Sequence, residues 1–257
     1  MTWTLAEIAG DVFPVFILAL LRIGAAMAFL PAFGERAVPL RIKLVLTLAL
    51  TALVLPTLLA TGAPPLERPA DWVLAGGAEV VSGLFLGFTF RLMVFALQVA
   101  GTIAAQSTSL AQVFGGAVTP DPQPALGNIF LMAGLALAAL SGLHVHLTEA
   151  FLLSFLLLPV GNFPNSDIIS AWAIADVSRM FVVGFTLSAP FVAAAMLYNL
   201  ALGAINRAMP QLMVAFVGAP ALTLGGLALA ALSVPFLLTH WWYLFEASIF
   251  APFGPVR

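Results

Sequence analysis

The chain has 257 residues, of which 62% are hydrophobic and only 8% are charged, and its mean hydropathy is +1.11. A soluble domain has about 25% charged residues, so this composition excludes a protein whose whole surface faces water. The net charge of −2 argues against a nucleic-acid-binding protein, and the lack of cysteine excludes disulfides and iron–sulfur clusters. The composition therefore predicts an all-α integral membrane protein, one membrane domain over residues 1–257, surrounded by lipid.

Apolar segments follow one another along the chain, at about 12–33, 42–60, 73–100, 128–160, 177–205 and 212–238. A helix needs about 20 residues to cross a 30 Å hydrocarbon core, which fits one crossing for each of the first two segments. The third segment would be about 42 Å long as a helix, so it must tilt or protrude. The fourth is too long for one crossing and too short for two. We therefore predict that it forms two half-length helices with a polar tip.

Prolines and glycines predict further breaks and close contacts. Eighteen prolines are present, and those inside or at the edges of apolar segments include Pro14, Pro31, Pro190, Pro220 and Pro235. Each frees backbone groups that neighbouring residues must satisfy, so several segments are expected to be kinked or to form hairpins. Gly83 and Gly87 make a GxxxG pattern, which predicts close packing of this helix against a neighbouring helix.

The densest basic cluster lies between the first two segments and consists of Arg36, Arg41 and Lys43. Short loops rich in Lys and Arg stay on the cytoplasmic side of the membrane. This loop is therefore predicted to be cytoplasmic, with the N-terminus and the connection at residues 61–72 on the opposite side.

Ionisable side chains within or close to apolar segments are Arg22, Glu79, Arg91, Arg179 and Arg207. In a membrane such groups line a transport path, pair with an opposite charge, or extend to the headgroups. The last option suits Arg179, at the start of a segment, whereas Arg22 lies near the middle of residues 12–33. For Arg22 and Arg91 we expect a buried pair with another subunit or within the same helix.

Candidates for catalysis or metal binding are few. Ser107, Thr108 and Ser109 cluster without a histidine near them in sequence, so we expect no enzymatic activity and no cofactor. His144, His146 and Glu149 carry metal-ligand groups, but the two histidines diverge on a helix and converge only on a turn. A polar hairpin tip is the favoured interpretation of these three residues, and we expect no metal.

The connection at residues 106–128 reads QSTSLAQVFGGAVTPDPQPALGN and combines small polar residues with large apolar ones. A solvated loop needs no such apolar side chains, whereas hydrophobic constrictions close pores by excluding water. We therefore predict a plug for a pore, with a loop packed against neighbouring helices as the alternative. The residues expected to form it are Gln106, Leu110, Val113, Phe114, Gly115 and Gly116.

Several stretches together resemble the FliR family, the R subunits of the flagellar type III export gate. Arg22-Ile23-Gly24 leads to residues 30–34 (LPAFG) and 37–43 (AVPLRIK), which look like the family's first helix and basic loop. Residues 199–226 (NLALGAINRAMPQLMVAFVGAPALTLGG) resemble its C-terminal signature. With the Gly83–Gly87–Arg91 helix and the Gln106–Phe114 loop, the resemblance extends over nearly the whole chain.

The resemblance implies a structural, pore-forming subunit of the export gate at the flagellar basal body, in the bacterial inner membrane. Implied partners are the P and Q subunits in a hetero-oligomer, the B and A export subunits, and the unfolded flagellar proteins that are exported. Residues 106–118 would be the plug inside the channel. Arg207 and Gln211, in the pattern Arg-x-x-Pro-Gln, would contact a partner subunit.

Two alternatives stay open. One is the T-type subunit of a virulence type III secretion system, which would use the same mechanism for a different cargo. The other is a small secondary transporter with broken helices around a midplane site. Inverted hydropathy repeats would favour the transporter, and none is evident. A proton relay would need several carboxylates within the helices, and Glu79 is nearly alone.

Overall fold

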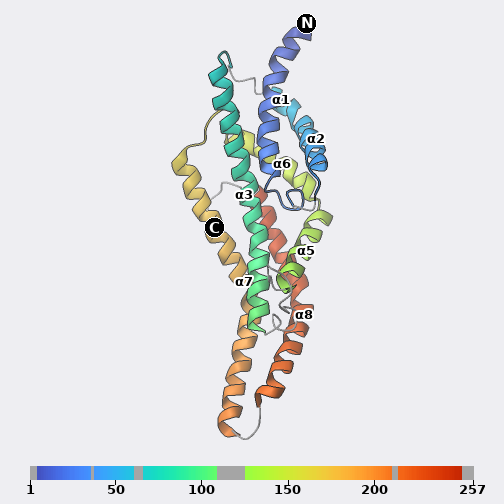
Figure 1. Cartoon of the computed structure of the whole chain (residues 1–257), viewed down its shortest axis with the longest axis vertical. Helices are drawn as coiled ribbons and strands as arrows, with labels where there is room; N and C mark the ends of the chain where they lie inside the picture. Colours follow the sequence, from blue (N-terminus) through green and yellow to red (C-terminus); the bar gives the residue numbers. More distant parts are fainter. Residues whose placement is uncertain (1–4, 36–37, 61–65, 109–124, 210–213, 251–257) are drawn as a thin grey trace. The chain divides into compact units, whose positions relative to one another are not determined.

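The computed structural model describes residues 5–35, 38–60, 66–108, 125–209 and 214–250 (Figure 1). Within these ranges the regular structure is helical and no strand occurs, which confirms the predicted all-α class. The helices in chain order are α1 (Leu5–Met27), α2 (Leu40–Leu59), α3 (Pro69–Ser107), α5 (Ala125–Leu140), α6 (Leu143–Leu157), α7 (Ser166–Ala208) and α8 (Val214–Phe250).

In the described chain, α2, α3, α7 and residues 220–250 of α8 are long and apolar enough to cross a membrane. The fourth predicted segment is broken as expected: α5 and α6 together resemble one span that bends by 79°. The bend lies at Gly142, whose φ of 85° is left-handed and therefore favours glycine. The polar tip is displaced, since His144 lies in the first turn of α6 rather than in the turn itself. The predicted apolar segments thus correspond to α1, α2, α3, the α5–α6 pair, α7 and α8.

Several helices extend beyond their apolar segments because polar residues build their ends. At the start of α3, Asp71 accepts a 3.0 Å hydrogen bond from the backbone N–H of Arg68, and Pro69 occupies the first helical position. This is the half of a capping box in which an acidic side chain reaches back to the N-cap. At the start of α7, Asn165 Oδ1 accepts a 2.9 Å hydrogen bond from the N–H of Asp167. A search for hydrophobic segments does not detect such polar capping residues, so it places the start of these helices too late.

The chain divides into two compact units, which are described separately. The first comprises residues 1–92, 139–176 and 245–257. Its core is the contact between α1 and the first half of α3, where a Cβ added at Gly83 would collide with the carbonyl oxygen of Arg22. A Cβ at Gly87 would meet the carbonyl oxygen of Ala26 in the same way. The neighbour that the glycine face approaches is therefore α1 of the same chain.

The second unit comprises residues 93–138 and 177–244. Trp241 of α8 is fully buried, and its Nε1 donates a 2.8 Å hydrogen bond to the carbonyl oxygen of Met93 in α3. The rings of Phe130 in α5 and Phe191 in α7 lie 6.2 Å apart beside one another. The helices α3, α5, α7 and α8 therefore all contribute buried residues to this unit, and the buried indole N–H has its partner.

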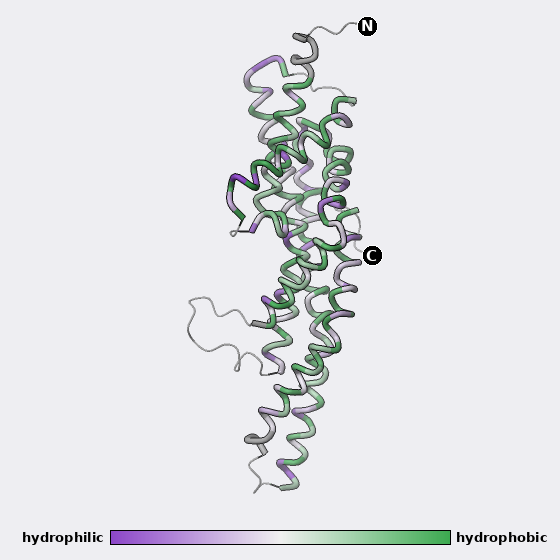
Figure 2. The backbone as a smooth tube through the Cα atoms, turned by 90° about the vertical axis from the view of Figure 1, so that its right-hand side faces the viewer, coloured by the Kyte–Doolittle hydropathy of each residue, from purple (hydrophilic) through white to green (hydrophobic). Residues whose placement is uncertain are grey.

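Hydrophobic residues predominate along nearly all helices (Figure 2), but their burial differs greatly between helices. The most apolar window of α3 is 67% buried, whereas those of α2 and α8 are 22% and 17% buried. The helix α3 is therefore the one around which others pack. The apolar surfaces of α2 and α8 face whatever surrounds the chain, lipid or other proteins.

Candidate functional site

A fully buried ion pair joins α1 to α3 in the first unit. The Nε of Arg22 donates a 2.6 Å hydrogen bond to Oε2 of Glu79, and its Nη2 donates a 3.0 Å bond to Oε1. Both side chains have no exposed surface. Two parallel N–H donors on two carboxylate oxygens make a bidentate pair, the strongest geometry available to arginine and a carboxylate.

The rest of this network comes from the end of α6 and the turn that follows it. Arg22 also donates from Nη1 to the carbonyl oxygen of Ser154 at 3.0 Å and from Nη2 to that of Leu158 at 2.8 Å. The backbone N–H of Gly161 donates a 2.7 Å bond to Oε1 of Glu79. We call Arg22, Glu79 and the three backbone groups of Ser154, Leu158 and Gly161 the Arg22 network. The carbonyl oxygens at Ser154 and Leu158 belong to the last turn and the C-cap of α6, where a cation is favoured by the helix dipole. The Ser154 carbonyl oxygen also accepts the backbone N–H of Leu158 at 2.8 Å.

Aromatic packing closes the network on one side. The Cζ of Arg22 lies 4.0 Å from the centroid of the Phe155 ring, within the range of a cation–π contact. Each nitrogen of the guanidinium and each oxygen of the carboxylate has a hydrogen-bond partner. A buried ion pair is tolerable only when its remaining donors and acceptors are satisfied in this way. The network is therefore a structural centre that fixes the α6–α7 turn to α1 and α3.

The close contact of α1 with α3 explains how the sequence builds this pair. Glu79 precedes Gly83 by one helical turn and therefore lies on the same face of α3. Because Gly83 admits the backbone of Arg22, the Arg22 side chain starts close to the Glu79 carboxylate. The expectation of a partner in another subunit or in the same helix is thus corrected: the partner of Arg22 is on another helix of the same chain.

Arg91 likewise takes its partner from its own chain. Its Nη1 donates to Oε1 of Glu35, in the connection after α1, and both side chains are partly exposed. Two residues earlier on α3, Thr89 donates a 2.8 Å hydrogen bond to Oδ2 of Asp176 in α7. Neither contact is with another subunit or within the helix of the arginine. These contacts fasten the connection after α1 and the first part of α7 to α3.

The histidine group forms contacts between helices. His146 Nδ1 lies 3.7 Å from Glu149 Oε2, and its Nε2 lies 3.7 Å from Oε1 of Glu246 in the last turns of α8. The edge of the Phe250 ring packs against the imidazole at 5.5 Å between centroids. Among the described residues, no three His, Cys, Asp or Glu side chains are grouped so that they could hold a metal ion. His146 therefore joins α6 to the end of α8, and His144 is exposed.

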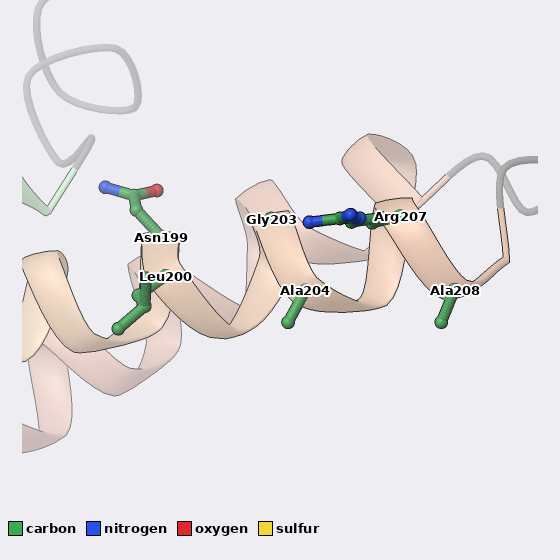
Figure 3. A pocket seen from close by; sticks show the side chains of 6 residues that line it. All are labelled: Asn199, Leu200, Gly203, Ala204, Arg207 and Ala208. Carbon is green, nitrogen blue, oxygen red and sulfur yellow. The ribbon is translucent and has the colours of Figure 1, made fainter.

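Arg207 lies in the last turn of α7 and is exposed. Its side chain runs along the helix surface toward Gly203, with Asn199 two turns from it (Figure 3). An open groove of about 560 Å³ follows this surface and is lined by Asn199, Leu200, Gly203, Ala204, Arg207 and Ala208. Gln211 lies outside the described residues. The geometry gives Arg207 no ion-pair partner among the residues that the structure describes.

Most of the predicted plug lies outside the described residues, namely Leu110, Val113, Phe114, Gly115 and Gly116. The connection is shorter than predicted, because Gln106 is an exposed residue in the last turn of α3 and α5 already begins at Ala125. Its first anchor is Thr108, which is buried and donates a 2.7 Å hydrogen bond to the carbonyl oxygen of Ala104. Thr108 packs against Gly226 of α8, where an added Cβ would lie 2.7 Å from Thr108 Cβ.

Comparison with known proteins identifies the family. The model of the family described as bacterial export proteins, family 1, matches residues 13–248. The chain belongs to this family. Flagellar biosynthetic protein FliR of Caulobacter vibrioides is 32% identical over 237 residues, which cover 89% of this chain and 92% of that protein. The FliR proteins of Escherichia coli K12 and Bacillus subtilis 168 are 32% identical over 231 residues and 34% identical over 221 residues. These alignments cover 88% and 82% of this chain, and 87% and 82% of those proteins.

As a member of the bacterial export proteins, the chain is a multi-pass component of the flagellar export apparatus. The relatives carry the name of a flagellar protein, which favours the flagellar system over the virulence alternative. The resemblance that was based on residues 199–226 and the first basic loop is confirmed. The sequence did not reveal that Glu79 pairs with Arg22. The observation that could have indicated this pair is the position of Glu79 one helical turn before Gly83, on the face of α3 predicted to pack closely.

Proposed function

We propose that the chain is a structural, pore-forming subunit of the flagellar type III export gate in the bacterial inner membrane. It helps to form the channel through which unfolded flagellar subunits leave the cell, and it carries out no reaction on them. The observation that carries this proposal is the family match over residues 13–248, together with relatives that share one flagellar name. The alignments run nearly end to end in both partners, so the proposal concerns the whole chain.

Helix lengths support a role inside an assembly. The 43 residues of α7 correspond to about 65 Å of helix, and a bilayer core is only about 30 Å thick. The apolar part of α8 is mostly exposed, with large side chains such as Leu224, Leu232 and Phe236 on its surface. A helix longer than the bilayer and apolar beyond it needs protein to cover the part outside the lipid. The P and Q subunits are the partners proposed for these surfaces, with the B and A export subunits on the cytoplasmic side.

Two surfaces of the chain are assigned roles within this proposal. Arg207 is exposed at the end of α7 beside an open groove, which suits a contact with a carboxylate or a C-terminal carbonyl of a partner subunit. The connection between α3 and α5 is the proposed plug, with Phe114 as its largest apolar side chain. It starts from a fixed point, since Thr108 is buried against Gly226. A plug that moves out of a pore must stay attached to the rest of the chain at a fixed point, and Thr108 provides one.

The proposal is tested by deleting residues 113–116 in cells that produce the whole gate. The deletion removes the largest apolar side chain and two glycines of the proposed plug. Because a hydrophobic seal works by excluding water, the membrane should then leak ions or small solutes. Phe114→Ala is the graded control, and it should leak less because Leu110 and Val113 remain.

Assembly is measured in the same cells by co-isolation of the tagged chain with the P and Q subunits. Normal co-isolation with a leaking membrane supports the pore and the plug together. Normal co-isolation with a tight membrane would place the seal elsewhere in the gate. If the unaltered chain does not co-isolate with the P and Q subunits, the proposed assembly is wrong.

A further inference from the structure

An apolar groove with a cation at one end runs between α1 and α2 in the first unit. It has a volume of about 530 Å³. Its walls are formed by apolar side chains and a glycine: Leu20, Gly24 and Met27 from α1, Ala28 just after α1, and Leu40 and Leu44 from α2. Lys43 and Thr47 complete the lining. Leu40 and Leu44 are 81% and 56% exposed, so the groove is open to the surroundings of the chain.

Among the polar side chains that line this groove, Lys43 has hydrogen-bond donors left for a ligand, whereas the Thr47 hydroxyl donates within its own helix. Thr47 donates its hydroxyl to the carbonyl oxygen of Lys43 at 2.7 Å, so its methyl group is left for apolar contacts. The ammonium of Lys43 donates one hydrogen bond, to the carbonyl oxygen of Gly34 at 3.0 Å. An ammonium has three donors, so capacity remains for an anion. Glu35, which follows Gly34, is engaged by Arg91.

The dimensions of the groove fit a lipid. Lys43 and the exposed Arg41 lie in the first turn of α2, the level at which a membrane helix meets the headgroups. From Met27 to Leu20 the wall on α1 extends about 10 Å, at 1.5 Å per residue. One leaflet of hydrocarbon is about 15 Å deep, so the wall accompanies most of an acyl chain. No acidic side chain belongs to the lining of this groove.

We propose that this groove binds an anionic phospholipid, with one acyl chain between α1 and α2 and its phosphate at Lys43 and Arg41. Charge complementarity selects the occupant: a cation at the headgroup level attracts an anionic lipid, while the remaining walls accept any acyl chain. The two first helices would then be held together partly by lipid, next to the basic loop. This inference needs only the membrane location of the chain and does not rest on the proposed pore.

The test uses the full chain, isolated with the subunits that accompany it and reconstituted in vesicles. Separate preparations contain phosphatidylglycerol or phosphatidylcholine with the same photoreactive acyl chain, and cross-linked residues are mapped by mass spectrometry. Labelling of the groove residues should be stronger with phosphatidylglycerol than with phosphatidylcholine. The expected ratio is about fivefold for each basic side chain that contacts the phosphate. Lys43→Gln should reduce this preference about fivefold, and Lys43→Arg should keep it.

The apolar part of the site is tested at Gly24. A Cβ added there would lie 3.6 Å from Thr47 Cγ2, an ordinary contact, so Gly24→Ala should leave labelling unchanged. Gly24→Leu should fill the groove and lower the labelling by both lipids. Equal labelling by the two lipids, or an unchanged preference in Lys43→Gln, would overturn the proposal. Labelling of the accompanying subunits without labelling of the groove residues would also overturn it, because lipid would then not reach this surface.

Discussion

The Arg22 network can be tested by replacing either partner of the ion pair with leucine. Glu79→Leu removes both oxygens that accept from Arg22 and the one that accepts from the Gly161 N–H. The guanidinium would remain fully buried with neutral partners alone, the two oxygens of Ser154, the carbonyl oxygen of Leu158 and the Phe155 ring. Arg22→Leu leaves the carboxylate buried with only the Gly161 N–H. Each change therefore leaves a charge without its counterion inside the protein.

The expected size of the effect distinguishes a charge from an ordinary hydrogen bond. Removing one partner of a buried ion pair costs about 3–5 kcal/mol. A hydrogen bond between membrane helices contributes only about 0.6 kcal/mol on average and at most about 1.7 kcal/mol. A loss of more than about 2 kcal/mol in the free energy of unfolding thus identifies the uncompensated charge. The double change Arg22→Leu with Glu79→Leu should cost less than the two single changes added, since neither charge remains.

The assay is denaturant-induced unfolding of the full chain in detergent micelles, read by protease resistance or tryptophan fluorescence. Arg68→Leu is the matched control, because it removes the exposed ion pair with Asp71, keeps the backbone N–H that Asp71 caps, and should leave the unfolding midpoint near that of the parent. If Glu79→Leu and Arg22→Leu both unfold at the parent midpoint, the network does not hold the α6–α7 turn. Single changes that simply add in the double variant would show that the two side chains act independently.

Three further changes test other contacts of the fold. Gly83→Leu should sharply lower the amount of folded chain in membranes, because its side chain would collide with the α1 backbone, whereas Gly10→Leu, with open space around it, should not. Gly142→Ala should lower the free energy of unfolding by about 1–2 kcal/mol, because the φ of residue 142 is left-handed. Gly225→Ala is the control and should not lower it, because an added Cβ there meets no neighbour. Equal unfolding midpoints for the two variants would argue against a fixed bend at Gly142. Arg207→Ala should leave the unfolding midpoint unchanged and reduce co-isolation with the P and Q subunits, and full co-isolation on a native gel would contradict a partner contact.

Hydrophobic patterning predicted which parts of the chain form helices, but not where the helices begin. The break in the fourth segment followed from its length and from the polar residues at its middle, and the structure bends it at Gly142. By contrast, α7 starts at Ser166, eleven residues before the predicted apolar segment at residue 177. Its first turns carry Asp167 and a cap from Asn165. Capping is a local polar signal, so it extends a helix into sequence that a hydrophobic criterion assigns to a loop.

The buried arginine was predicted from depth in its segment, but its partner required tertiary information. Arg22 and Glu79 are 57 positions apart, and Gly161 is 82 positions from Glu79. No helical spacing relates positions so distant. The sequence does contain the needed combination, since Glu79, Gly83 and Gly87 recur every four residues on one helix face. A close-packing face that carries a lone carboxylate indicates that the facing helix supplies the cation.

The way Glu79 is held also bears on the transporter alternative. Among residues whose burial the structure describes, Glu79 is the one buried carboxylate. Its two oxygens accept three hydrogen bonds, two from Arg22 and one from the Gly161 N–H. A relay group must be free to exchange its partners, whereas all three of these donors depend on the Glu79 carboxylate as their acceptor. They join α1, α3 and the turn after α6. A side chain that holds three segments together in this way is a poor proton relay, which argues against the transporter alternative.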